Sequence, residues 1–171
     1  NGFSYRSDDH GNNTVSATIL HNSNSSVSAT GIIERNTDID YFRFTTASGN
    51  VSLDIQPFYR SPNLDILARV YDSIGTVIAT SNPANLLSAS FNLNLNPNST
   101  YYLSVTGTGK PPSITENGYS DYGSLGAYTI QGTIASHLPD LAGWWTDVLS
   151  ENLSWGQSFQ VFGQVRNLGA G

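Results

Sequence analysis

The chain contains no cysteine, which excludes a disulfide framework and a thiolate zinc site. Methionine is absent too, including at position 1, so we expect the numbering to begin inside a longer protein or at a processed end. No apolar run approaches the length of a membrane-spanning helix, and no signal peptide is recognisable. A chain of 171 residues is nevertheless long enough to bury a sizeable core by packing alone.

Charge is also scarce, and its balance is acidic. Charged residues make up 12% of the chain, the formal net charge is −6, and Lys110 is the single lysine. A nucleic-acid partner calls for a basic stripe, and the sequence has none. The polar residues are mainly asparagine, serine, threonine and glycine, a composition common in secreted bacterial β-domains. We therefore expect a secreted, extracellular or cell-surface protein with no nucleic-acid partner.

Motifs for catalysis are missing as well. The three histidines, His10, His21 and His137, lie outside any His-Glu-x-x-His segment and are not beside a candidate nucleophile. The sequence contains no Gly-x-Ser-x-Gly elbow, phosphate-binding loop or dinucleotide fingerprint. A Ser/His/Asp arrangement built from distant loops stays open as an alternative. We predict no active site in this fragment.

The chain is rich in short alternating or β-branched runs, separated by turns containing Gly, Pro, Asn and Ser. Eight or nine such runs at this spacing predict an all-β fold, an antiparallel β-sandwich or jelly roll. The first run could instead form one helical turn near Ser16–Leu20. The predicted strands are Thr14–Leu20, Ser26–Ile33, Asp40–Thr45, Asn50–Pro57, Asp65–Asp72, Val77–Ser81, Ser88–Leu95, Thr100–Gly107 and Gly126–Ile134.

Pro139 marks a predicted domain boundary. Residues 1–135 are predicted to form the β-sandwich, and residues 136–171 a linker followed by the first strands of a second β-domain. Ser158–Val165 alternates cleanly between apolar and polar residues and predicts one of those strands. A segment this short cannot close a sandwich by itself, so we expect the second domain to be incomplete here.

The most informative segment is Asp38–Phe44. Side chains two apart in a strand share a face, so Asp38 and Asp40 should point the same way, beside a buried Phe42 and Phe44. Paired carboxylates at the start of a strand either hold a hard cation or cap a turn. Because no partner acid, base or nucleophile accompanies them, they favour an accessory module over an enzyme.

A second acidic segment, residues 8–14, places several oxygen donors around Gly11. Calcium takes roughly six to eight oxygen ligands, and this N-terminal loop with the two strand carboxylates could supply most of them. The spacing is not that of an EF-hand. The alternative is that Asp9 or Asn13 caps a turn and Asp38 begins a tight loop. The predicted metal ligands are Asp8, Asp9, Asn12, Asn13, Asp38 and Asp40.

Tyrosines mark a possible ligand-binding surface. Residues 118–126 contain Tyr119, Asp121 and Tyr122 between glycines, which either form a binding surface or lie across the end of the sandwich. Tyr101 and Tyr102 are adjacent in a predicted strand, so one should face the core and the other solvent. We interpret Asp65, between two apolar residues, as a hydrogen-bonding partner of a neighbouring loop.

The order and spacing of these segments resemble the bacterial pre-peptidase C-terminal domain, a family related to the collagen-binding domains of clostridial collagenases. The likeness runs from about Tyr5 to Ile134. The combination of the N-terminal loop with Gly118–Gly123 is similar to versions that follow zinc metallopeptidase domains. The segments that carry it are Asp8–Asn13, Asp38–Phe44, Leu64–Leu67, Val70–Gly75, Thr100–Val105 and Gly126–Ile130.

The resemblance implies a secreted β-sandwich downstream of a peptidase domain, with calcium held by an acidic N-terminal segment and aspartates such as Asp38 and Asp40. One departure affects the ligand set: the loop has Asp-Asp-His-Gly where collagenase members have glutamates. Collagen binding would depend on a tyrosine-lined face, matched only at Tyr101 or Tyr102. The tail is similar to the start of Ig-like (CARDB-type) bacterial adhesion modules.

Two functions follow as hypotheses. The first is a non-catalytic accessory domain of a secreted bacterial metallopeptidase, supporting stability, spacing or attachment to a protein or polysaccharide matrix, with calcium as its cofactor. The second is a carbohydrate- or surface-binding module of a large secreted adhesin. A His-Glu-x-x-His segment upstream would favour the first, and further β-repeats the second.

Overall fold

The structure is a computed structural model that describes residues 2, 6–112, 117–136, 141–148 and 161–167, the last two ranges by their backbone only. The chain divides into two compact units, Asn1–Ser136 and His137–Gly171. Every predicted site residue lies in the first unit. Its strands are β1 (Thr18–Ile19), β2 (Asn22–Ser23), β3 (Ser26–Ile33), β4 (Ile39–Thr46), β5 (Asn50–Pro57), β6 (Ile66–Tyr71), β7 (Val77–Ser81), β8 (Ala89–Asn94), β9 (Ser99–Gly107) and β10 (Gly126–Ile134).

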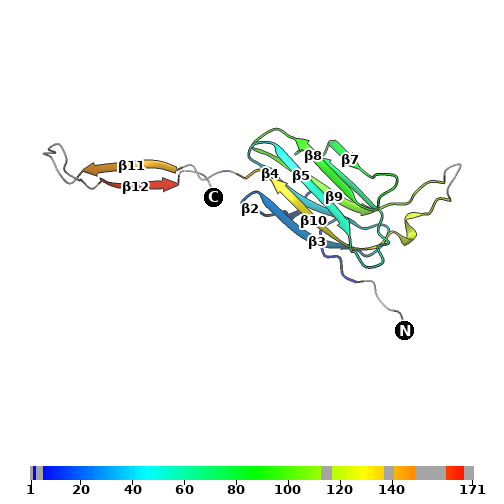
Figure 1. Cartoon of the computed structure of the whole chain (residues 1–171). Coiled ribbons are helices and arrows are strands. Elements are labelled where there is room, and N and C mark those ends of the chain that lie inside the picture. The colour runs from blue at the N-terminus through cyan, green and yellow to red at the C-terminus, as the bar shows by residue number, and fades with distance from the viewer. Residues whose placement is uncertain (1, 3–5, 113–116, 137–140, 149–160, 168–171) are drawn as a thin grey trace. The chain divides into compact units, whose positions relative to one another are not determined.

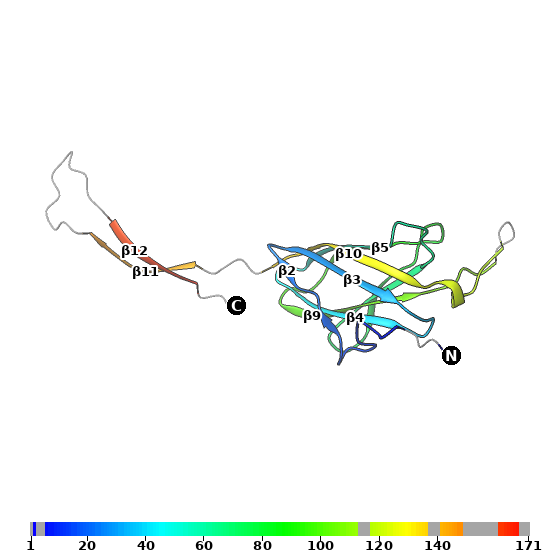
Figure 2. The same ribbon diagram turned by 90° about the horizontal axis from the view of Figure 1, so that it is seen from below.

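These strands form two five-stranded sheets packed face to face (Figures 1 and 2). Sheet A has the order β1-β4-β9-β6-β7, and sheet B has the order β2-β3-β10-β5-β8. Neighbouring strands are antiparallel except for the short β1, which runs parallel to β4. The prediction of an antiparallel β-sandwich is confirmed. Within the described residues the one helical element is a 3-10 turn, η1 (Asp121–Gly123), and no helix is long and apolar enough to cross a membrane.

Alternation of residue type along the strands creates the core. In β5, Val51, Leu53 and Ile55 face inward, and the residues between them are exposed. In β9, Leu103 and Val105 are fully buried. The apolar sides of both sheets therefore meet in a single hydrophobic core, as a period of two predicts.

Five predicted strands, those at Thr14, Asp40, Asp65, Ser88 and Thr100, start at a different residue in the structure, and a side-chain hydrogen bond explains two of them. The predicted strand Thr14–Leu20 is reduced to β1, because the Asn13 side chain accepts hydrogen bonds from the Val15 and Ser16 backbone and holds a turn there. The predicted strand Asp65–Asp72 begins one residue later, because the backbone N–H of Asp65 donates to the Ser124 hydroxyl (2.8 Å).

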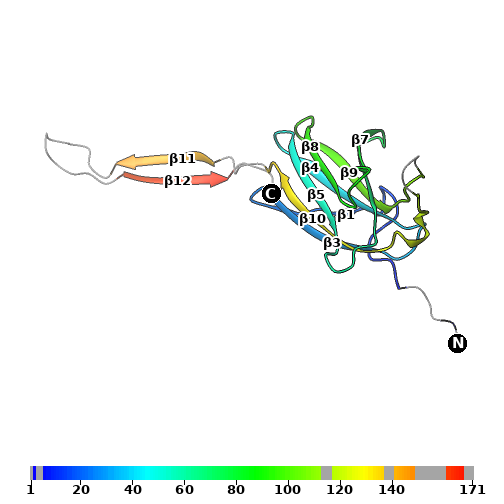
Figure 3. The same cartoon turned by 45° about the vertical axis from the view of Figure 1, so that its right-hand side comes forward.

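The starts of β4 and β6 and the N-terminal loop lie at one end of the sandwich, which we call the loop end. β4 begins there opposite Thr106 near the end of β9, and β6 begins opposite Gly107. The N-terminal loop joins it, because the backbone N–H of Tyr41 donates to the Gly11 carbonyl (3.0 Å). Figure 3 shows this blue N-terminal segment at the same end as the yellow-green segment before β10.

The second unit contains β11 (Leu141–Val148) and β12 (Val161–Asn167), which pair antiparallel with an irregularity between Gly143 and Trp145. The predicted strand Ser158–Val165 overlaps β12, and its first three residues lie outside the described residues. The assignment of this unit to a second domain stays a prediction.

Candidate metal site at the loop end

Asp38 and Asp40 point into the sandwich rather than toward solvent. Their exposed fractions are 4% and 0%, and those of Phe42 and Phe44 are 0% and 3%. The register of β4 explains this, since its even-numbered side chains all face the core. The prediction that the two carboxylates share a face with the two phenylalanines is confirmed.

Asp40 has one oxygen satisfied and one without a hydrogen-bond partner. The Tyr128 phenol donates to Asp40 Oδ2 at 2.5 Å, across the core from sheet B. Asp40 Oδ1 is buried and finds no hydrogen-bond partner in the described part of the chain. Burial, opposed by the Tyr128 hydrogen bond and reinforced by the charges of Asp38, Asp9 and Asp8, raises the pKa of Asp40 to about 7.

Gly31 makes room for the Tyr128 phenol. It lies directly opposite Tyr128 in the β3–β10 pair, and a Cβ atom added there would overlap the phenol oxygen. The aspartate and tyrosine can therefore meet only because this strand position carries no side chain.

The N-terminal loop brings further carboxylates to the same place. Asn12 Oδ1 accepts from the Ile39 backbone N–H (2.9 Å), and Asp9 Oδ1 accepts from the Ile32 N–H (3.4 Å). The loop is thereby attached to both β4 and β3. One carboxylate oxygen from each of Asp8, Asp38 and Asp40 lies within 4.8 Å of the others, and the same holds for Asp8, Asp9 and Glu34.

Glu34 is a member of this cluster that the sequence prediction missed. Both of its carboxylate oxygens are buried without a hydrogen-bond partner among the described residues. Burial, together with the neighbouring Asp38 carboxyl, raises the pKa of Glu34 to about 7. Its position four residues before Asp38, where the β3–β4 turn reverses the chain, is the signal that could have identified it; the backbone N–H of Glu34 donates to Asp38 Oδ2 (3.2 Å).

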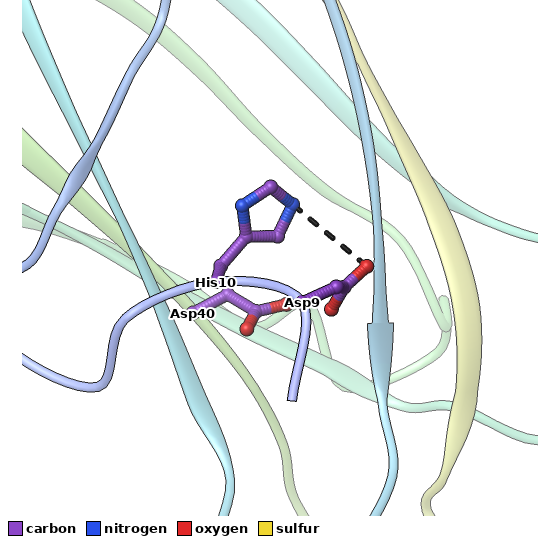
Figure 4. Close-up of side chains that lie close together, drawn as sticks. All are labelled: Asp9, His10 and Asp40. Atoms are coloured by element: carbon purple, nitrogen blue, oxygen red, sulfur yellow. Dashed lines mark ion pairs between the residues drawn. The ribbon is translucent and has the colours of Figure 1, made fainter. Parts of the chain in front are cut away.

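His10 lies beside the cluster but is held by other partners (Figure 4). Its Nε2 is 2.8 Å from the Thr30 carbonyl oxygen and 3.9 Å from Asp9 Oδ2, and its Nδ1 is 2.9 Å from the Thr18 hydroxyl. Because a carbonyl only accepts, Nε2 carries a hydrogen and is not available to a metal. The ring also packs on Phe42, with centroids 4.5 Å apart. The donors at this site are therefore all oxygens.

The two predicted asparagine ligands have structural partners. The Asn12 side-chain NH2 donates to Asp8 Oδ2, and Asn12 Oδ1 accepts from the Ile39 backbone N–H. Asn13 Oδ1 accepts from Val15, from the Ser16 N–H and from the Ser16 hydroxyl. The structure thus brings Asp8, Asp9, Asp38 and Asp40 together, places Asn12 as the residue that orients Asp8, and leaves Asn13 outside the cluster.

Five carboxyl groups this close repel one another unless cations or protons neutralise them. Calcium prefers hard oxygen donors and accepts carboxylates in flexible geometry, which fits the donor set present. The group Asp8, Asp38 and Asp40 could hold a metal ion, with Asp9 and Glu34 close to Asp8. Because both ring nitrogens of His10 are hydrogen-bonded to other groups, His10 is not a metal ligand in this arrangement. The site therefore does not suit a metal that prefers nitrogen ligands.

The predicted tyrosine surface divides into separate places. Tyr101 is buried, stacks on Phe44 and exchanges hydrogen bonds with the Asn96 backbone through its hydroxyl. Tyr102 is half-buried on the other side of the same strand. One faces the core and the other faces outward, as predicted.

Tyr119 and Tyr122 line a hollow of about 390 Å³ at the loop end, next to Pro62, Asn63 and Leu87. Asp121 lies in η1 and is half-buried, outside that lining. The Tyr119 hydroxyl donates to Asp65 Oδ2 (2.7 Å), which raises the pKa of Tyr119 to about 12. Asp65 therefore bonds a neighbouring loop, as we interpreted from the sequence.

Fold and geometry together define a β-sandwich domain with a buried acidic cluster at one end. The sequence matches no protein-family model and no curated protein sequence. The structure matches the crystal structure of the pre-peptidase C-terminal domain of collagenase from Bacillus anthracis with a TM-score of 0.47 and 16% identity, over 76% of this chain and 100% of that chain. The likeness of residues 136–171 to adhesion modules stays a prediction.

Proposed function

We propose that residues 1–135 form a non-catalytic accessory domain of a secreted bacterial peptidase, held rigid at the loop end by calcium. In this proposal the domain stabilises or spaces the enzyme and attaches it to an extracellular matrix. Residues 136–171 begin a second, Ig-like domain. The motifs quoted above, from Asp8–Asn13 to Gly126–Ile130, support the peptidase context.

One observation supports calcium above all others: the fully buried carboxylate of Asp40 with an unpartnered oxygen, facing Asp8 and Asp38. An unpaired buried charge costs several kcal/mol or is protonated. A divalent cation would convert that repulsion into attraction and would tie the N-terminal loop to β4.

The non-catalytic part of the proposal rests on how the polar groups are used. Both ring nitrogens of His10 are hydrogen-bonded, one to the Thr18 hydroxyl and the other to the Thr30 carbonyl oxygen. The Asp65 carboxyl accepts a hydrogen bond from the Tyr119 hydroxyl. These contacts hold the fold in place and leave neither group poised beside a nucleophile.

Calorimetric titration of calcium into the metal-free chain tests the proposal, with thermal melting as a second readout. We expect saturable binding and a rise in the melting temperature, since a ligand that binds only the native state stabilises it. Asp38→Asn should weaken calcium binding at least about tenfold, because it removes one charged ligand from the shell. Asp54→Asn is the matched control: it removes the same charge from the outer face of sheet B and should leave binding unchanged. A melting curve that does not respond to calcium would contradict the proposal.

The peptidase context needs a different test, the sequence that flanks this chain in its full-length protein. A metallopeptidase domain upstream supports the accessory role, while further β-repeats without a peptidase support the adhesin alternative. Both outcomes are independent of whether calcium binds.

A further inference from the structure

The outer faces of the two sheets differ in charge and in aromatic content. In the strands of sheet A the cationic residues are Arg43 and Arg69, and the one carboxylate, Asp40, points inward. The strands of sheet B contain no lysine or arginine, and their one carboxylate, Asp54, faces outward. In a chain with 13 acidic and seven basic residues, an outward sheet face with arginines and no carboxylate is unexpected.

Three tyrosines accompany the two arginines. Strand register places Tyr102 between Arg43 on β4 and Tyr71 on β6, and places Ser104 between Tyr41 and Arg69. The rings of Tyr41 and Tyr71 are 5.7 Å apart, and the Tyr71 hydroxyl lies 3.3 Å from the Ser104 hydroxyl. We call the group Tyr41, Arg43, Arg69, Tyr71 and Tyr102 the Tyr–Arg face.

The arginines of this face have no carboxylate partner within the described residues. Arg43 makes no side-chain hydrogen bond there either. Arg69 contacts Tyr71. Burial raises the pKa of Tyr71, but hydrogen bonds with Ser104 and Tyr41, together with the charge and a hydrogen bond of Arg69, lower it below its ordinary value. A guanidinium group has five N–H donors, so this bond leaves others free. Both guanidinium groups thus keep donors available for an anion.

The two arginines are well separated along the sheet. They lie on strands either side of β9, opposite residues two apart, which corresponds to roughly 12 Å between their Cα atoms. Such a spacing suits two anionic groups on one extended ligand better than a single small anion. A hollow of about 420 Å³ adjoins Arg43, lined also by His21, Asn22, Thr45 and Thr100.

We propose that the Tyr–Arg face binds an acidic polysaccharide, a chain of sugars carrying sulfate or carboxylate groups. The arginines match its charges, and the tyrosine rings with the hydroxyls of Thr45, Thr100 and Thr106 match its polyhydroxylated rings. This inference deepens the attachment role proposed above and rests on it.

Other occupants fit the face less well. A protein partner would require an apolar centre. The large aliphatic side chains of sheet A that are exposed or half-buried surround the Tyr–Arg face rather than occupy its centre: Ile19, Ile39, Leu67, Val77 and Ile78. An anionic membrane is recognised by clusters of about four to eight basic residues, and this face has two.

Binding of the whole 171-residue chain in calcium to heparin, polygalacturonate, dextran and poly-glutamate tests the proposal. We expect binding to the two acidic polysaccharides that weakens as salt rises, and none to neutral dextran. The double variant Arg43→Gln/Arg69→Gln should lose at least about tenfold in affinity, since a hydrogen bond to a charged group is worth about that factor. Arg60→Gln, which removes an equal charge from the β5–β6 loop, is the matched control and should bind normally.

Arg43→Gln alone guards against misfolding of the double variant, because Arg43 has no side-chain hydrogen bond in the described structure, and it should still weaken binding severalfold. Equal losses in Arg60→Gln and the double variant, tighter binding to poly-glutamate than to polysaccharide, or equal binding to dextran would each overturn the proposal. A chain that binds calcium but none of these polymers would overturn this inference and leave the calcium-stabilised accessory role standing.

Discussion

In the described part of the chain, the acidic cluster at the loop end and the Tyr–Arg face of sheet A both carry charges without a partner of opposite sign, negative charges in the cluster and positive charges on the face. The cluster holds carboxylates whose oxygens are buried without partners, while the face holds an exposed arginine, Arg43, and a half-buried one, Arg69, without a carboxylate partner among the described residues. Burial decides what each imbalance costs. A buried unpaired charge lowers the free energy of unfolding, whereas an exposed charge is solvated by water and remains available for binding. The cluster should therefore control stability, and the face should control ligand affinity.

The largest expected effect is a dependence of stability on pH that reverses with calcium. The pKa values of Asp40 and Glu34 are raised to about 7 from 3.8 and 4.5, so the folded chain without metal binds more protons than the unfolded chain between about pH 4 and 7. Its stability is greatest at low pH within this window and falls as pH rises through 7. For Asp40 alone the loss between pH 5 and pH 8 is on the order of 3 kcal/mol, because the pKa in the folded chain lies about two units above pH 5.

Chemical denaturation in chelator at pH 5 and pH 8 measures this loss. In saturating calcium the trend should reverse, because the ion competes with protons for the same oxygens. Asp72 does not interfere: backbone hydrogen bonds, that of Thr76 first, lower its pKa, so it titrates below the window. Asp40→Asn should reduce the difference in stability between the two pH values in chelator, leaving the part due to Glu34. A metal-free chain equally stable at both pH values would contradict the assignment.

A second test removes the hydrogen bond between Tyr128 and Asp40 while leaving the charges of the cluster unchanged. Gly31→Ala would place a methyl group where the Tyr128 phenol lies and push that phenol away from Asp40. We expect a loss of roughly 1–3 kcal/mol from overpacking, and weaker calcium binding because Asp40 shifts. Gly123→Ala is the control, since the nearest atom to its added Cβ lies 3.7 Å away. Equal stability of the two variants would show that Tyr128 is not confined by Gly31.

A third test compares adjacent tyrosines on opposite sides of β9. Tyr101→Phe removes the hydroxyl that both accepts from and donates to the Asn96 backbone, and should cost about 1 kcal/mol in denaturant unfolding. Tyr102→Phe, on the Tyr–Arg face, should leave stability unchanged within about 0.5 kcal/mol. The reverse order would mean that the outer face supports the fold.

The smallest effect on stability is expected from the arginine of the face. Arg43→Gln should change the free energy of unfolding by less than about 0.5 kcal/mol, since the residue is exposed. A thermal melt of this variant beside Asp38→Asn, in calcium, separates the two regions directly. A destabilisation by Arg43→Gln as large as that by Asp38→Asn would remove the distinction between them.

Local pattern predicted most of the fold. The strand at Asn50–Pro57 and its buried positions follow from strict alternation, and the prediction matches β5 at both ends. The start of the chain was harder, because whether Asn13 ends a turn or a strand continues through it depends on one side-chain hydrogen bond. Glu34 was missed for a related reason: its role depends on a chain reversal that brings its carboxylate to residues 8–9.

The sequence by itself determined the all-β fold, the common face of Asp38 and Asp40, and the opposite sides of Tyr101 and Tyr102. All three follow from the two-residue period of a strand, which is a local property. Only the tertiary structure decided that five carboxylates converge, that His10 is excluded from them, and that Arg43, Tyr102 and Tyr71 lie in one row. Those outcomes depend on which strands become neighbours, and neighbours distant in sequence are chosen by packing of the whole core.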